Sequence, residues 1–119
     1  MQERGSLSLK KSIRLKKNKE FKRVYNYGKS WANKYLVLYR LEQKNNQLKV
    51  GFSVSKKIGN AVVRNKLKRQ MREIFRLNKD KIKNKNASFV FIARQRVKEA
   101  DYNEIEKSAL DLLRRADKK

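Results

Sequence analysis

The alternation of hydrophobic and polar residues changes its period at Gly59, near the middle of the chain. Before this glycine, residues 48–54 alternate Val and Phe with small or polar residues, which is typical of a β-strand. After it, Asn60 is a good N-cap, and the following residues include no Pro or Gly through position 77. The pattern therefore predicts a strand over 48–54 and a helix over 60–77.

This central helix is amphipathic and strongly basic on its polar side. Its apolar arc consists of Val63, Leu67, Met71, Ile74 and Phe75. The opposite side holds Arg64, Asn65, Lys68, Arg69, Arg72 and Arg76, with Lys66 at its edge. A solvated helix normally alternates charges, whereas like charges four residues apart repel each other. The arrangement favours a polyanion as partner over a merely solvated face.

The rest of the chain continues this mixture of helices and strands. The pattern predicts a helix from an N-cap at Asn18 to Gly28, then a strand over 30–42 that forms an antiparallel hairpin with 48–54. A further strand is expected over 88–94. We expect an α+β fold with a small, mostly antiparallel sheet packed with three helices, in the order αββαβα.

The last helix is expected to begin at Asp101, where Glu104 completes a capping-box pattern. Its apolar stripe is Ile105, Ala109, Leu112, Leu113 and Ala116. Residues 13–119 then make one domain, preceded by a mobile basic arm over residues 1–12.

Charge changes the picture from a generic small domain to one that binds a polyanion. The 119 residues include 34 Lys and Arg but only 11 Asp and Glu, for a net charge of +23. Residues 1–98 hold 29 of the basic and 5 of the acidic side chains, so we expect the C-terminal segment to face away from the ligand. No apolar run reaches the roughly 18 residues of a membrane span. We therefore expect a cytoplasmic protein with no membrane contact.

The chain offers little for catalysis of its own. It has no His and no Cys, and its carboxylates are scattered apart from a set near residue 101 that helix capping explains. We expect no catalytic residue and no metal site on the protein. Two hypotheses fit these features of the residues: a structural RNA-binding protein such as a ribosomal protein, and a DNA-binding regulator. The last is disfavoured because no short helix-turn-helix precedes the basic helix.

Two aromatic residues of the first helix allow two interpretations. Phe21 and Tyr25 lie four residues apart, on one face of that helix, beside Lys22 and Arg23. They could belong to the core, or they could form a platform on which bases stack, each stack being worth about 1–3 kcal/mol. Composition alone does not choose between these roles.

The stretch SVSKKIGNAVVRNKLKRQMRE resembles the signature of the bacterial ribonuclease P protein component. RLKKNKEF, KYLVLY and FIAR also occur in the order and spacing of that family, so the resemblance covers residues 13 to 116. Arg64 and Asn65 match the Arg-Asn-Arg core of the signature, and Lys66 stands in place of its second Arg. Lysine keeps the charge but lacks the planar fork of arginine.

The resemblance implies a subunit that binds a catalytic RNA and the 5′ leader of precursor tRNA. The RNA would remove the leader by hydrolysis that depends on Mg²⁺ held mainly by the RNA, and no obligate protein partner is expected. It also implies a left-handed βαβ crossover through the central helix. The implied contacts to the catalytic RNA are Lys56, Lys57, Arg64, Asn65, Lys66, Lys68, Arg69 and Arg72. The implied leader-binding cleft consists of Phe21, Tyr25, Val37 and Tyr39, which favours the cleft role for the aromatic pair.

Overall fold

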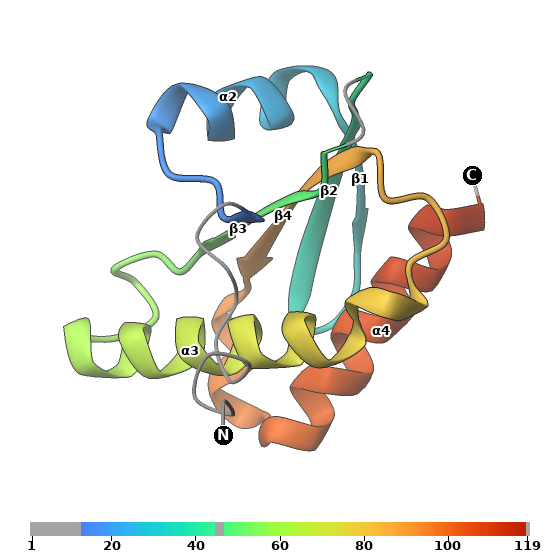
Figure 1. Ribbon diagram of the computed structural model, residues 1–119. Coiled ribbons are helices and arrows are strands. Elements are labelled where there is room, and N and C mark those ends of the chain that lie inside the picture. The colour runs from blue at the N-terminus through green and yellow to red at the C-terminus, as the bar shows by residue number, and fades with distance from the viewer. Residues whose placement is uncertain (1–12, 45–46, 119) are drawn as a thin grey trace, which may run out of the picture.

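The computed structural model describes residues 13–44 and 47–118, so the arm predicted over 1–12 lies outside the described residues. Three helices pack around a four-stranded sheet (Figure 1). The helices are α2 (Asn18–Tyr27), α3 (Ala61–Asn78) and α4 (Tyr102–Lys118), and the 3₁₀ turns are η2 (Lys79–Lys81) and η3 (Gln95–Glu99). The strands are β1 (Lys29–Ala32), β2 (Leu36–Glu42), β3 (Lys49–Ser53) and β4 (Ala87–Ala93).

The predicted α+β class is confirmed, and two of the three strand pairings are antiparallel. The sheet has the order β1-β2-β4-β3, in which β1 with β2 and β2 with β4 are antiparallel and β3 with β4 is parallel. As predicted, α3 connects β3 to β4. The left-handedness of this crossover stays a prediction.

The prediction of a single strand over 30–42 is wrong, because the chain turns at Asn33 and forms two strands. The side-chain Oδ1 of Asn33 accepts hydrogen bonds from the backbone N–H groups of Tyr35 and Leu36, at 3.3 and 3.1 Å. This Asx-type turn divides the segment into β1 and β2, which pair with each other. The element order is therefore αβββαβα, with one strand more than predicted.

The predicted hairpin between 30–42 and 48–54 is also wrong, because β4 lies between β2 and β3. Both faces of β4 are buried along most of its length. A central position in the sheet favours such an apolar strand, because there its side chains are removed from water on both faces. The outer edge of β3 is partly covered by the N-terminal segment, where Leu15 N donates to Val50 O at 2.8 Å.

The two faces of the sheet are covered unequally. Helices α3 and α4 cover one face and enclose the main core, whose fully buried side chains include Leu36, Phe75, Phe89 and Leu112. Helix α2 covers part of the other face, where a smaller hydrophobic cluster has Leu15, Val24 and Val90 as its buried members. This second face therefore keeps several apolar side chains half-buried at the surface.

The helix termini confirm two predicted caps and correct a third. Asn60 Oδ1 accepts from Val63 N at 3.0 Å, and Asp101 and Glu104 form the predicted capping box. Asn18, however, is the first residue of α2 and not its cap. The carboxylate of Glu20 caps this helix by accepting from the backbone N–H groups of residues 16 and 17, at 3.0 and 3.1 Å.

The predicted apolar stripe of α4 is buried throughout, whereas one member of the stripe on α3 is not. Val63 is 38% exposed, because it lies in the first turn of α3, which extends beyond the sheet. No helix in the described ranges is long and apolar enough to cross a membrane.

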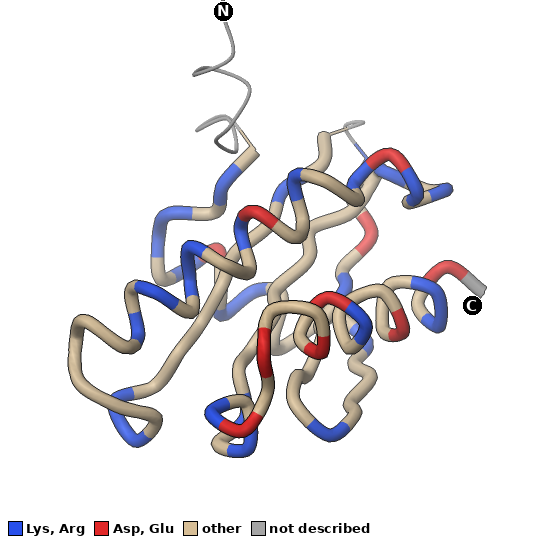
Figure 2. Tube along the Cα trace, turned by 90° about the horizontal axis from the view of Figure 1, so that it is seen from below, with Lys and Arg blue, Asp and Glu red and all other residues tan. Residues whose placement is uncertain are grey.

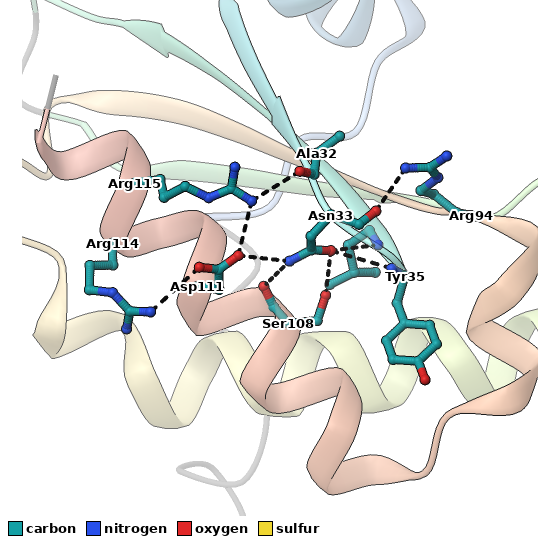
Figure 3. Close-up of polar contacts among 9 residues, drawn as sticks. Ala32, Asn33, Tyr35, Arg94, Ser108, Asp111, Arg114 and Arg115 are labelled. Atoms are coloured by element: carbon teal, nitrogen blue, oxygen red, sulfur yellow. Dashed lines mark hydrogen bonds and ion pairs between the residues drawn. The ribbon is translucent and has the colours of Figure 1, made fainter.

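A polar cluster fastens the turn between β1 and β2 to α4 (Figure 3). The Nδ2 group of Asn33 donates to Ser108 O at 2.9 Å and to Asp111 Oδ2 at 3.1 Å. Arg115 donates to Asp111 and to the carbonyl of Ala32, at 3.0 and 2.9 Å. These bonds satisfy groups that would otherwise be costly to bury, so they fix α4 against the edge of the sheet.

Candidate RNA-binding surface

Basic residues gather on α3 and on the segment that leads into α2, whereas acidic residues gather on α4 and the turn before it (Figure 2). Of the predicted RNA contacts, Lys56, Lys57, Asn65, Lys66 and Arg69 are exposed, and Arg64, Lys68 and Arg72 are half-buried. All eight are accessible to a partner, on α3 up to position 72 and in the loop before it.

Arg64 is held in place by the loop that precedes its helix. Its Nε donates to the carbonyl of Gly59 at 3.1 Å. Because this bond orients the planar guanidinium, less side-chain freedom is lost when a phosphate binds to it.

The half-buried cations Lys68 and Arg72 line a pocket together with the predicted cleft residue Phe21. We call it the basic pocket; it has a volume of about 480 Å³ and lies at the β3 edge of the sheet, between α2 and α3. Its lining consists of Arg14, Leu15, Lys16, Phe21, Val50, Gly51, Phe52, Lys68 and Arg72. It holds four cationic side chains and no acidic one, beside the aromatic rings of Phe21 and Phe52.

The basic pocket has an unbalanced positive charge. Burial, and then the nearby positive charges of Arg14 and Arg69, lower the pKa of the Arg72 guanidinium. The Nε of Arg14 is buried and has no hydrogen-bond partner within the described part of the chain. An anion in the pocket would offset the repulsion and supply acceptors, which is the chemistry of a phosphate site.

Phe21, Tyr25 and Tyr39 form a continuous strip, which we call the aromatic strip, between α2 and the sheet. The Tyr25 ring lies edge-on to Tyr39 with centroids 5.1 Å apart, and 6.4 Å from the Phe21 ring. Burial raises the pKa of the Tyr25 hydroxyl, and the nearby Ser53 side chain acts in the opposite direction. All three rings are half-buried, so each packs on the small second cluster while keeping surface open to solvent.

Val37, the fourth predicted cleft residue, lies on the same face of the sheet. It is half-buried in β2, next to Tyr39 along that face and opposite Ile92 of β4. The structure thus brings the predicted cleft residues onto one face. Phe21 alone among them also reaches the basic pocket.

Sequence reasoning missed the contribution of the N-terminal segment to the basic pocket. Arg14 and Lys16 line it because the bridge of Arg14 to Val50 lays this segment along β3. The alternation of basic residues around Leu15 was the available signal, but the pairing with a strand 36 positions away has no local signature.

No group of three or more acidic side chains in the described residues is placed to hold a metal ion. The acidic residues near the start of α4 are used instead in its capping box and in a pair between Arg96 and Glu99. These acidic side chains therefore have structural partners within the described part of the chain.

Three comparisons agree on the family. The family model for ribonuclease P matches residues 9–117. The ribonuclease P protein component of Clostridium botulinum (strain 657 / Type Ba4) is 47% identical over 106 residues, which cover 89% of this chain and 96% of that protein.

Two solved structures share the fold. The Staphylococcus aureus RNase P protein is 41% identical with a TM-score of 0.82, over 89% of this chain and 96% of that one. The Thermotoga maritima RNase P protein is 35% identical with a TM-score of 0.77, over 86% and 96%. With its central signature, its fold and nearly its whole length in common with these proteins, the chain belongs to the bacterial ribonuclease P protein component family.

Proposed function

We propose that this protein binds the catalytic RNA of ribonuclease P through α3 and the 5′ leader of precursor tRNA through the aromatic strip and the basic pocket. The RNA then hydrolyses the phosphodiester bond that joins the leader to the mature tRNA. The protein contributes leader affinity and neutralises phosphate charge. We place this role in the cytoplasm.

The observation that carries the proposal is the meeting of two kinds of residue in one pocket. Phe21 offers a ring face for stacking, and Lys68 and Arg72 lie beside it as phosphate partners. A nucleotide of a single strand offers an open base face for the ring and a phosphate for the neighbouring cations. In a regular duplex the base faces are covered by the neighbouring bases. The pocket therefore suits the leader better than it suits the body of the tRNA.

Magnesium ions enter the proposal through the RNA. The carboxylates of the described residues do not form a set that fits Mg²⁺, which prefers octahedral oxygen ligands. The role of the protein is then to bring the leader and the catalytic RNA together while lowering the repulsion between their phosphates.

Reconstitution tests the proposal. Purified protein added to its catalytic RNA should restore cleavage of precursor tRNA at physiological Mg²⁺, with a 5′ end at the mature position. The RNA alone should need a higher Mg²⁺ concentration, and the RNA-free protein should be inactive. A protein that binds this RNA without any effect on cleavage would instead be a structural RNA-binding protein, and the proposal would be wrong.

A further inference from the structure

A second pocket lies at the β1 edge of the sheet, and most of its lining side chains are on the face opposite the aromatic strip. None of the predicted RNA contacts lines it. We call it the edge pocket; it has a volume of about 270 Å³. Its lining consists of Tyr27, Lys29, Trp31, Arg40, Leu41 and Glu42. Lys29 pairs with Arg40 across the β1–β2 ladder, so the two cations lie side by side.

Arg40 is the unusual residue of the edge pocket. It is only 9% exposed, its guanidinium lies over the Phe89 ring with 5.9 Å to the centroid, and its Nη1 is 3.7 Å from Glu42 Oε2. Its Nε is buried with no hydrogen-bond partner among the described residues. A buried cation with one long ion pair retains donor capacity for a further anion.

The aromatic residues give the edge pocket its second property. Tyr27 ends α2 with 74% of its surface exposed, so its ring is open to a partner. Trp31, two residues beyond Lys29 on the same face of β1, is half-buried against the main core. Two aromatic rings flank two cations, and Glu42 is the one acid of the pocket, so its net charge is positive.

We propose that the edge pocket binds one nucleotide of single-stranded RNA, with the phosphate on Lys29 and Arg40 and the base on Tyr27 or Trp31. Anionic peptides would use the cations but not the exposed ring faces, and duplexes would not offer a base to stack. The inference extends the RNA-binding role proposed above. It places a second contact on the side of the sheet away from the aromatic strip.

Trp31 is the only tryptophan of the chain and lines the edge pocket, so tryptophan fluorescence reports on the surroundings of this one ring. Titration of the full-length protein with 5′-phosphorylated triadenylate should quench this emission in a saturable way. Tyr27→Ala should weaken the binding measured by this signal about five- to a hundredfold, the loss of one stacking contact. Lys29→Gln should weaken it and flatten its salt dependence. Both side chains are exposed, so neither change should impair folding.

Tyr25→Ala is the matched control, because it removes a tyrosine from the aromatic strip and should leave the Trp31 titration unchanged. Calorimetry with the same triadenylate registers binding at both places. Binding that depends on Tyr25 but leaves the Trp31 emission unaltered would overturn the edge pocket and leave the proposed function intact. Equal affinity of Tyr27→Ala, Lys29→Gln and wild type would overturn it too. No binding of triadenylate at all would count against both proposals.

The nucleotide could come from the catalytic RNA or from the leader, and the assembled complex distinguishes these sources. Quenching of Trp31 on addition of the catalytic RNA alone assigns the pocket to that RNA. Quenching that appears only with precursor tRNA, and grows with leader length, assigns it to the leader. Either result supports a nucleotide site, whereas an unchanged emission in both complexes would overturn it.

Discussion

The Phe21 ring lies so close to the backbone of Gly51 that a Cβ on this glycine would be 2.5 Å from both Cε1 and Cζ of the ring. Phe21 and Gly51 both line the basic pocket, so the contact between the ring and the glycine backbone forms part of the pocket wall. A side chain at position 51 would push the ring toward α2, which carries it.

Gly51→Ala should therefore lower the free energy of unfolding by about 1–3 kcal/mol, the usual cost of overpacking. Urea unfolding measures this. Phe21→Leu in the Gly51→Ala background should recover part of the loss, because a shorter side chain leaves room for the new methyl group. A double-mutant cycle gives the coupling. Strict additivity of the two changes would show that the ring and the glycine do not constrain each other.

Arg69→Ala should weaken binding to the catalytic RNA and flatten the log–log salt dependence by about one unit per lost phosphate contact. Arg69 is exposed, so the melting temperature should stay the same. The charge-matched control is Arg114→Ala, which removes an exposed arginine from α4, among acidic residues. Equal weakening by both changes would mean that RNA binding follows net charge and not the surface of α3.

Asp111 should make the stability depend on acid pH. Hydrogen bonds from Asn33 and then Arg115 lower the pKa of this carboxyl below its ordinary value of 3.8. Since the pKa is lower in the folded state, the stabilisation is complete well above pH 3.8 and is lost as the pH falls through the folded pKa.

The corresponding measurement is urea unfolding of the wild type and Asp111→Asn across this pH range. The stability difference between them should be largest near neutral pH and should shrink in acid. Asp80→Asn is the control, since the Asp80 side chain is 90% exposed. A wild-type advantage that persists undiminished below the folded pKa would contradict the ionic role of Asp111.

The helices were predictable because each has a local signature. Asn60 and the Asp101–Glu104 box begin α3 and α4 where expected, since a cap depends on residues within one turn. The turn at Asn33 was missed because the surrounding residues favour strand, and only the Asn33 side chain, bonded to two backbone groups, interrupts them. The central position of β4 depends on contacts between distant segments, so local patterns could not provide it.

The candidate site was predictable in part for the same reason. The helical period places Lys68 and Arg72 on one face of α3, and the i,i+4 spacing places Phe21 beside Tyr25. That Phe21, Arg14 and the cations of α3 line one pocket follows only from the packing of three separate segments around β3. The edge pocket depends likewise on the pairing of β1 with β2, which the uninterrupted strand prediction excluded.

The central claim is that the aromatic strip contacts the leader, and the affinity ratio of the assembled complex for precursor over mature tRNA tests it most directly. Tyr25→Ala should weaken precursor binding by about 1–3 kcal/mol through the lost stacking contact and leave mature tRNA binding unchanged, since mature tRNA has no leader. Tyr102→Ala, which removes a half-buried tyrosine from α4, should leave the ratio at the wild-type value. An unchanged ratio in a folded Tyr25→Ala protein would contradict the claim and leave α3 as the only RNA contact argued from the family signature.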